Sequence, residues 1–187
     1  YKKFGFKDFI IAAGYKKRIL INYFKNKKIK DTKIQVIDTG LNTMTGGRLK
    51  RLKKYLINET FMLTYGDGLS DVNIRKLLNF HKKNKKIATL TAVRPPARFG
   101  AVRIKGNKVK YFKEKSKLDV GWINGGFFVF NSKVFDFIKN DGTFLEREPL
   151  KKLCKIGELN AFQHRGFWQC MDTIRDRQII EEILKRK

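Results

Sequence analysis

The sequence has 187 residues, a formal net charge of +26, and 42% hydrophobic residues. This length predicts one domain, and the apolar content is enough for a packed core, which excludes a wholly disordered chain. No apolar run approaches the roughly 18 residues that a membrane-spanning helix needs. Cys154 and Cys170 fit neither a disulfide framework nor a paired zinc motif, so we expect a reducing compartment such as the cytoplasm.

The positive charge comes mainly from lysines that are spread over nearly every segment of the chain. Specific nucleic-acid surfaces instead tend to cluster arginine with aromatic stacking platforms. We therefore interpret the charge as a solvated, lysine-rich surface that also attracts small anionic substrates. A lysine-rich nucleic-acid-binding domain remains the alternative from another class, and its affinity would fall steeply with salt.

The first half of the chain alternates between strand and helix patterns. Strands are predicted over residues 7–13, 33–36, 61–65 and 87–93, and helices over 15–24, from 45 onward, and over 71–83. The helix that starts near residue 45 has Leu49, Leu52 and Leu56 on one face. Such alternation predicts a mostly parallel sheet covered by helices on both faces.

The pattern changes after Arg94-Pro95-Pro96. A hairpin is predicted over 100–105 and 108–113, followed by a hydrophobic strand over 122–130 that contains Gly125-Gly126. Helices over 132–138 and 146–156, a strand over 158–163 and a helix over 173–184 complete the chain. We expect one α/β domain with a mixed, mainly parallel sheet flanked by helices and interrupted by a hairpin-rich insertion.

Two carboxylates follow apolar stretches, where ligands of open α/β sheets bind. Asp67 lies between Gly66 and Gly68, and Asp172 precedes the last helix. Two such carboxylates could hold Mg²⁺, which prefers oxygen ligands and shares them with substrate phosphates. Each also has a simpler explanation, since Asp-Gly is common in turns and Asp often caps a helix.

Two further segments could contact anions. Gly46 and Gly47 at a helix start can expose backbone N–H groups, and Arg48 can add a fork of donors. Lys115 can meet a phosphate, while Gly125 in a strand lets a ligand approach the backbone. A capped surface helix and a charged hairpin are the corresponding simple alternatives. His81 and His164 have no partner at ligand spacing, so we interpret both as structural or exposed.

Taken in order, several motifs resemble the glucose-1-phosphate cytidylyltransferase branch of the sugar nucleotidyltransferase family. The similarity runs from Tyr1 almost to Lys187. The motifs are Met44-Thr45-Gly46-Gly47-Arg48-Leu49-Lys50-Arg51, Thr64-Tyr65-Gly66-Asp67-Gly68, Arg98-Phe99-Gly100-Ala101, Glu114-Lys115, Ile123-Asn124-Gly125-Gly126-Phe127-Phe128, and Gly166-Phe167-Trp168-Gln169 followed by Met171-Asp172-Thr173.

The resemblance implies a Rossmann-like nucleotidyltransferase fold and the joining of CTP with α-D-glucose 1-phosphate to give CDP-glucose and diphosphate. UTP- or dTTP-dependent enzymes of the same class are the alternative, because the Gly-Asp and Glu-Lys elements are widely shared. The resemblance further implies a cytoplasmic enzyme that supplies CDP-glucose for O-antigen and lipopolysaccharide biosynthesis. The implied site residues are Asp67 and Asp172 as Mg²⁺ ligands, Thr43, Arg48 and Gly66 at the nucleotide, Lys115 at the sugar phosphate as a catalytic residue, and Gly100, Glu114, Asn124 and Gly125 around the hexose.

The sequence also departs from this family. The family's N-terminal strand and Gly-rich triphosphate loop are absent, so we expect the 187 residues alone to bind CTP poorly and to be almost inactive. The stretch between Phe24 and Val36 is shorter than the family's oligomer-contact segment, although a homo-oligomer is still expected for the full-length protein. Ser116 and Cys170 replace prolines, which can alter loop stiffness without removing a ligand.

Overall fold

The computed structural model describes residues 1–27, 29–96, 101–113 and 121–185. The chain forms two compact units made of interleaved segments. Unit 1 comprises Tyr1–Phe61, Ile74–Ala88 and Val129–Asn160, and unit 2 comprises Met62–Asn73, Thr89–Phe128 and Ala161–Lys187.

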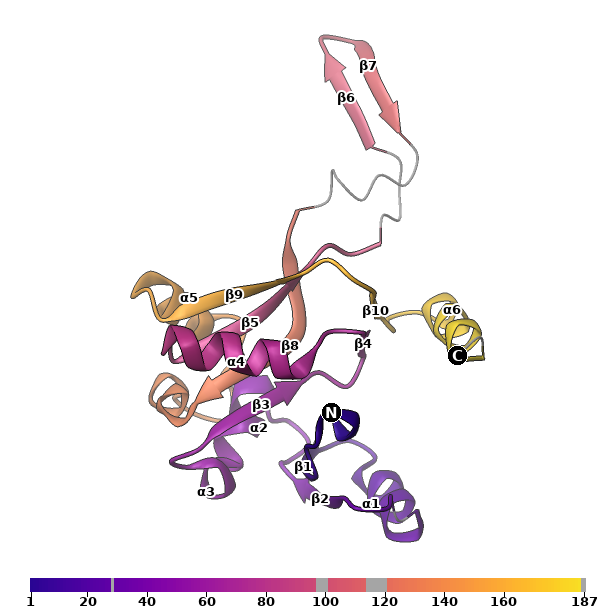
Figure 1. Ribbon diagram of the computed structural model, residues 1–187. Coiled ribbons are helices and arrows are strands. Elements are labelled where there is room, and N and C mark those ends of the chain that lie inside the picture. Colours follow the sequence, from indigo (N-terminus) through magenta and orange to yellow (C-terminus); the bar gives the residue numbers. More distant parts are fainter. Residues whose placement is uncertain (28, 97–100, 114–120, 186–187) are drawn as a thin grey trace. The chain divides into compact units, whose positions relative to one another are not determined.

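The strands and helices predicted for the first half are present (Figure 1), with two differences. The helix expected from residue 45 onward is divided into two, and an additional short strand follows the one at residues 60–64 without a helix between them. They are η1 (Lys2–Phe4), β1 (Asp8–Ala13), α1 (Lys17–Asn26), β2 (Lys33–Asp38), α2 (Thr45–Arg51), α3 (Lys53–Leu56), β3 (Thr60–Thr64), β4 (Gly68–Ser70), α4 (Ile74–Asn84) and β5 (Ala88–Val93). The remaining elements are β6 (Ala101–Lys105), β7 (Lys108–Lys113), β8 (Ile123–Asn131), η2 (Ser132–Phe137), α5 (Glu148–Lys155), β9 (Leu159–His164), β10 (Trp168–Cys170) and α6 (Ile174–Lys185).

The largest sheet has four strands in the order β3-β8-β5-β9. The end of β8 meets the start of β5, where the Asn131 N–H donates to the Ile87 carbonyl over 2.8 Å. At the other end, Gly125 lies against Val93, so β8 and β5 run antiparallel. By contrast β1 pairs with β2 in parallel register. The β1–β2 pair forms a separate two-stranded sheet, so the described part of the chain contains both antiparallel and parallel strand pairs.

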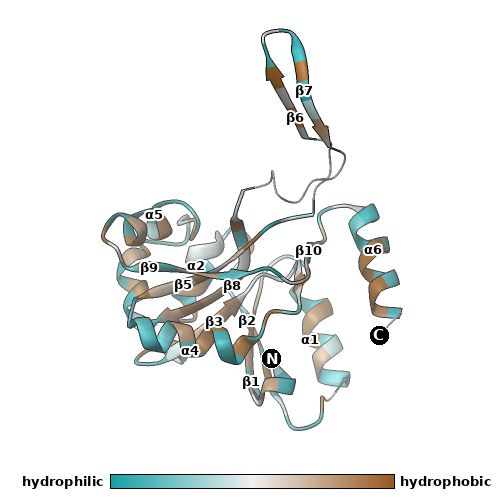
Figure 2. Ribbon diagram, turned by 45° about the horizontal axis from the view of Figure 1, so that its top comes forward, coloured by the Kyte–Doolittle hydropathy of each residue, from teal (hydrophilic) through white to brown (hydrophobic). Residues whose placement is uncertain are grey.

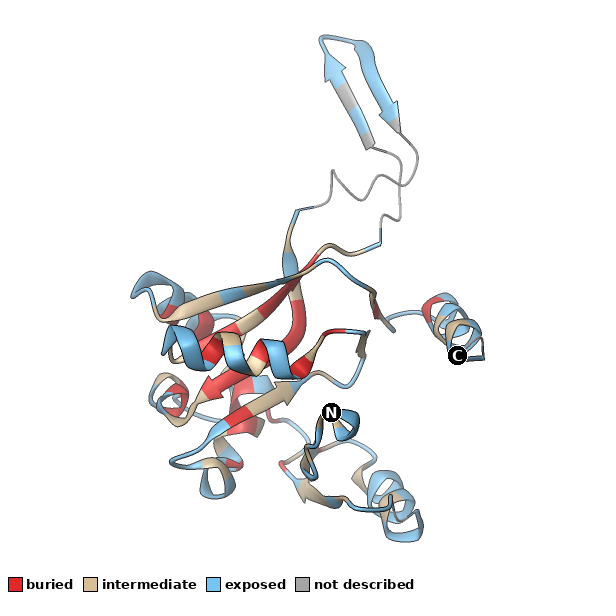
Figure 3. Ribbon diagram, in the orientation of Figure 1, coloured by how far each residue is buried: buried red, intermediate tan, exposed pale blue. Residues whose placement is uncertain are grey.

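Burial follows the hydrophobic pattern along these strands and helices. Figure 2 shows hydrophobic residues along β5 and β8, and Figure 3 shows the same strands as buried. In α4 the buried residues Ile74, Leu77 and His81 repeat at the spacing of one helix face. The core of unit 1 includes Phe61, whose ring lies 5.7 Å from that of Phe130 and so fixes the start of β3 against β8.

The predicted hairpin is formed by β6 and β7, with a register shift between Arg103 and Ile104. Within the pairing, Val102 lies opposite Phe112 and Ile104 opposite Val109. Because side chains alternate along a strand, the bulge is what brings Val109 and Phe112 onto one face of the hairpin.

Candidate active site

Asp67 and Asp172 flank the end of a short two-stranded ladder in unit 2. Strands β4 and β10 pair antiparallel, with Gly68 opposite Cys170. One step further, the Met171 N–H donates to the Asp67 carbonyl over 2.9 Å. The residue before β4 and the residues after β10 therefore lie at the same end of the ladder. Both aspartates are exposed there.

The start of α6 does not use Asp172 as its cap. The Asp176 N–H donates to the Thr173 hydroxyl over 3.1 Å, and the Thr173 N–H donates to the Asp176 carboxylate over 3.0 Å. This reciprocal pair is a capping box. The buried Gln169 amide donates to the other Asp176 oxygen over 3.1 Å and ties the helix start to β10. Asp172 instead accepts a hydrogen bond from the Cys170 thiol at 3.1 Å.

The Asn124-Gly125 motif is joined to the same ladder. The Trp168 indole N–H donates to the Gly125 carbonyl over 2.8 Å, and the Tyr65 N–H donates to the Gly126 carbonyl over 2.9 Å. The Asn124 side-chain oxygen accepts a hydrogen bond from the Gly126 N–H, so this oxygen stabilises the backbone of its own segment. A Cβ at Gly125 would lie 2.7 Å from a Val93 methyl group, which explains the glycine.

Unit 2 thus brings together five of the predicted site residues, namely Gly66, Asp67, Asn124, Gly125 and Asp172. Two exposed carboxylates are a chemically suitable donor set for Mg²⁺, which usually binds one or two carboxylates and takes its other oxygens from water and phosphates. The described residues contain no group of three or more His, Cys, Asp or Glu side chains that could hold a metal. An ion bound there would take its remaining oxygens from water or phosphates.

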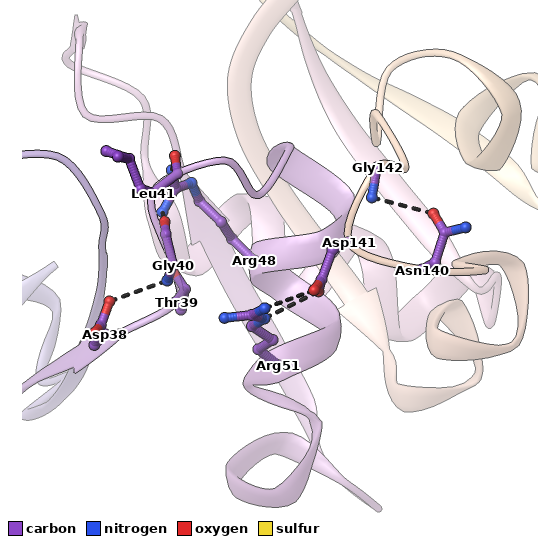
Figure 4. Close-up of polar contacts among 9 residues, drawn as sticks. All are labelled: Asp38, Thr39, Gly40, Leu41, Arg48, Arg51, Asn140, Asp141 and Gly142. Carbon is purple, nitrogen blue, oxygen red and sulfur yellow. Dashed lines mark hydrogen bonds and ion pairs between the residues drawn. The ribbon is translucent and has the colours of Figure 1, made fainter.

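The other predicted nucleotide contacts, Thr43 and Arg48, lie in unit 1. Figure 4 shows Arg48 beside the loop of Thr39, Gly40 and Leu41. Arg48 donates to the Thr39 hydroxyl over 2.8 Å and to the Gly40 carbonyl over 2.9 Å, with a longer bond to the Leu41 carbonyl. Its guanidinium therefore braces the loop that follows β2. This bracing role was not predicted from the sequence.

Gly46 and Gly47 pack against the chain instead of presenting N–H groups to an anion. Both N–H groups donate to the Thr143 carbonyl, at 3.0 and 3.2 Å, which corrects the idea that they are exposed for phosphate. A Cβ at Gly47 would lie 2.3 Å from the Asp141 carbonyl oxygen. The Asp141 carboxylate also accepts two hydrogen bonds from the Arg51 guanidinium. This guanidinium holds the pKa of the Asp141 carboxyl below its ordinary value.

Some predicted residues lie outside the described residues, namely Gly100, Glu114 and Lys115, together with Ser116. Their proposed roles stay predictions. The two histidines lie in different units of the chain. His164 contacts the Asp71 carboxylate at 2.9 Å, and His81 is buried in α4, where desolvation lowers its pKa.

Sequence reasoning gave no role to two tryptophans of unit 2. Trp168 belonged to a motif but received no role, and nothing in its neighbours indicated a bond to Gly125. Trp122 is flanked by two guanidinium groups, with Arg94 at 5.1 Å and Arg165 at 5.8 Å from its ring. Arg94 directly follows β5, so its position at a strand end was the available signal.

Comparison with known proteins places this geometry in a family. The model of the nucleotidyl transferase family matches residues 2–173. A glucose-1-phosphate cytidylyltransferase from Salmonella typhimurium is 44% identical, over 100% of this chain and 81% of that protein. A Bacillus subtilis protein named “Probable glucose-1-phosphate cytidylyltransferase” is 38% identical, over 94% of this chain and 77% of its own length.

Among solved structures, HddC from Yersinia pseudotuberculosis superimposes with a TM-score of 0.76 at 21% identity, covering 98% of this chain and 81% of that one. The fold is thus the α/β fold of nucleotidyltransferases, enzymes that move a nucleotidyl group between phosphates. The chain belongs to the nucleotidyl transferase family. No helix in the described part of the chain has the length and apolar character needed to cross a bilayer.

Proposed function

We propose that this protein transfers the cytidylyl group of CTP to α-D-glucose 1-phosphate, giving CDP-glucose and diphosphate. The 44% identity to a glucose-1-phosphate cytidylyltransferase over the whole chain supports the substrate pair. The observation that carries the chemistry is the β4–β10 ladder, which holds Asp67 and Asp172 at one end beside the Asn124-Gly125 motif.

The reaction is an in-line substitution at phosphorus. A phosphate oxygen of glucose 1-phosphate attacks the α-phosphorus of CTP and forms the new P–O bond. The bond from the α-phosphorus to the bridging oxygen breaks, and diphosphate leaves with the electron pair. Positioning of two polyanions and neutralisation of their charge supply most of the catalysis in such reactions.

Asp67 and Asp172 are the residues that would hold Mg²⁺, and the bound ion would neutralise charge on the reacting phosphates. Within the chain, the Cys170 thiol and the capping box of α6 orient Asp172. The Trp168–Gly125 bond fixes the strand beside them.

The nucleotide is assigned to Gly66, with Thr43 and the Arg48-braced loop. The hexose phosphate is assigned to Lys115, with Gly100, Glu114, Asn124 and Gly125 around the sugar. The proposal further includes a cytoplasmic location and a homo-oligomeric full-length protein. Its product, CDP-glucose, would serve the synthesis of surface polysaccharide.

The test is a substrate screen on the natural protein that contains this sequence. Diphosphate release is measured with glucose 1-phosphate and CTP, UTP or dTTP in turn, and CTP is expected to give the highest kcat/KM. Preference for UTP or dTTP would reassign the nucleotide, and no release with any of them would refute the proposed reaction. A salt-sensitive affinity for DNA or RNA without transfer would favour the nucleic-acid alternative.

The carboxylates are tested in the same protein. Asp67→Asn and Asp172→Asn should each lower kcat by at least about a hundredfold, because neutral amides are weak magnesium ligands. Asp136→Asn, at an exposed aspartate of unit 1, is the matched control and should keep the activity. Near-normal rates of either site variant at limiting Mg²⁺ would reject the metal assignment.

A further inference from the structure

Unit 1 contains a hollow of about 650 Å³ that shares no residue with the site assigned to nucleotidyl transfer. This volume is in the range of small-molecule sites. The end of α4, the turn before β5, the ends of β8 and η2 that adjoin one another, the start of β3 and the residue before β9 contribute to its wall. Its lining is Thr60, His81, Lys82, Lys85, Lys86, Ile87, Asn131, Lys133 and Glu158.

The charge of this hollow is strongly positive. It is lined by four lysines and one glutamate, and the glutamate is already engaged by the chain. Glu158 accepts from Lys86 at 3.2 Å and from the Ile87 N–H at 3.1 Å, and both bonds lower its pKa. Lys82 and Lys85 form no ion pair with any residue that the structure describes. Lys133 also acts on Glu158 and lowers its pKa, but four lysines and one glutamate still leave the lining a net charge of +3 for a ligand.

The wall is held by the backbone as well as by side chains. The Asn131 side-chain oxygen accepts the Lys133 N–H at 2.9 Å, and the Asn131 N–H donates to the Ile87 carbonyl at 2.8 Å. Lys85 adopts a left-handed backbone conformation (φ +51°), which residues other than glycine rarely adopt. Lys82 lies in the last turns of α4, Lys85 just after it and Lys133 in η2, so three exposed lysines from adjoining segments line the same hollow.

We propose that this hollow binds a small oligophosphate anion, either free diphosphate or the triphosphate tail of a nucleotide. Three uncompensated charges match an anion of about that charge, and lysine binds phosphate as a compact point charge. Among the described residues, the lining contains no Phe, Tyr or Trp on which a base could stack. The site therefore recognises the phosphates and not the base.

The experiment measures acylation of each lysine by mass spectrometry in EDTA, which removes Mg²⁺ and so separates this site from metal-dependent binding at the candidate active site. Saturating inorganic diphosphate should slow labelling of Lys82, Lys85 and Lys133 by about tenfold, because an amine that is hydrogen-bonded to phosphate is a poor nucleophile. Lys25, Lys151 and Lys155, exposed on α1 and α5, are the internal controls. A parallel experiment uses CTP in place of diphosphate. The anion that protects these lysines from acylation at the lower concentration identifies the preferred ligand.

Variants provide the second measurement. The double substitution Lys82→Gln/Lys85→Gln should weaken calorimetric binding of diphosphate in EDTA by about tenfold, whereas Lys25→Gln/Lys155→Gln should leave it unchanged. Equal slowing at the control lysines, or equal weakening by the two double variants, would mean that only the general positive charge attracts the anion. Either result, or an absence of protection with both anions, overturns the proposal.

Discussion

Replacing Gly47 with alanine should separate α2 from the segment around Asp141. The added Cβ would lie 2.3 Å from the Asp141 carbonyl oxygen and 2.5 Å from its Cα. Both atoms belong to the backbone, so no side chain can turn away to relieve the contact. The helix must move relative to this segment, and the Met44 N–H bond to the Asp141 carbonyl, 2.8 Å long, must lengthen with it.

The expected loss of unfolding free energy follows from three terms. Overpacking costs about 1–3 kcal/mol, and each strained or broken backbone bond adds about 0.5–1.5 kcal/mol. Alanine recovers about 1 kcal/mol, since it forms helix more readily than glycine. The exposed Arg51–Asp141 pair adds little. With one such bond lost, the net loss is about 2 kcal/mol, within a range of about 0.5–3.5 kcal/mol, which is a large share of the stability of an ordinary domain.

Urea unfolding followed by circular dichroism measures this loss, and Gly142→Ala is the matched control. Gly142 directly follows Asp141 in the segment that packs against Gly47. A Cβ at Gly142 would meet only the Asn140 side-chain oxygen at 3.5 Å, an ordinary van der Waals distance. That variant should be neutral or slightly stabilised, because alanine restricts the unfolded chain. A Gly47→Ala protein within about 0.5 kcal/mol of the natural one would refute the packing explanation for this glycine.

Three further predictions concern single side chains. Trp168→Phe removes the indole donor to Gly125 and should cost about 1–2 kcal/mol in urea unfolding together with a lower kcat. Trp122→Phe, which keeps an aromatic ring between Arg94 and Arg165, serves as the comparison. Lys115→Ala should raise the KM for glucose 1-phosphate far more than the KM for CTP, and an unchanged sugar-phosphate KM would reject its assigned contact. Burial lowers the pKa of His81 in the folded chain. Below about pH 6.5 this imidazole therefore binds a proton in the unfolded chain but stays neutral in the folded one. Stability should therefore be fully present above that pH and fall as the pH drops toward the lowered pKa, and His81→Asn should flatten this part of the stability curve.

Long periodic segments could be predicted from the sequence because burial alone fixes their pattern. The strand β8 and the helix α4 are examples, although α4 begins at Ile74 and not at Asp71. The reason is Ser70, whose hydroxyl accepts the Val72 N–H and donates to the Phe167 carbonyl. The Ser70 hydroxyl is therefore engaged by its own turn and by the residue that precedes β10, and does not cap a helix that starts at Asp71.

Short elements and glycine roles could not be predicted, because tertiary contacts decide them. The strands β4 and β10 have three residues each, too few to show a period, and their pairing joins segments far apart in sequence. Gly46 and Gly47 carry the same sequence signal whether they face a phosphate or a neighbouring segment. Only the position of Thr143, which accepts both N–H groups, distinguishes the two.

The relation between Asp67 and Asp172 depends on the register of β4 and β10. A slip of one residue would turn each side chain of a strand to the other face of the ladder. Bonds outside the ladder oppose such a slip, since Ser70 donates to the Phe167 carbonyl and Trp168 donates to Gly125. The buried Gln169 of β10 donates a hydrogen bond to Asp176 at the start of α6. Residues that touch no substrate therefore determine how well the two carboxylates are aligned, and their substitution should lower kcat without changing the chemistry of either aspartate.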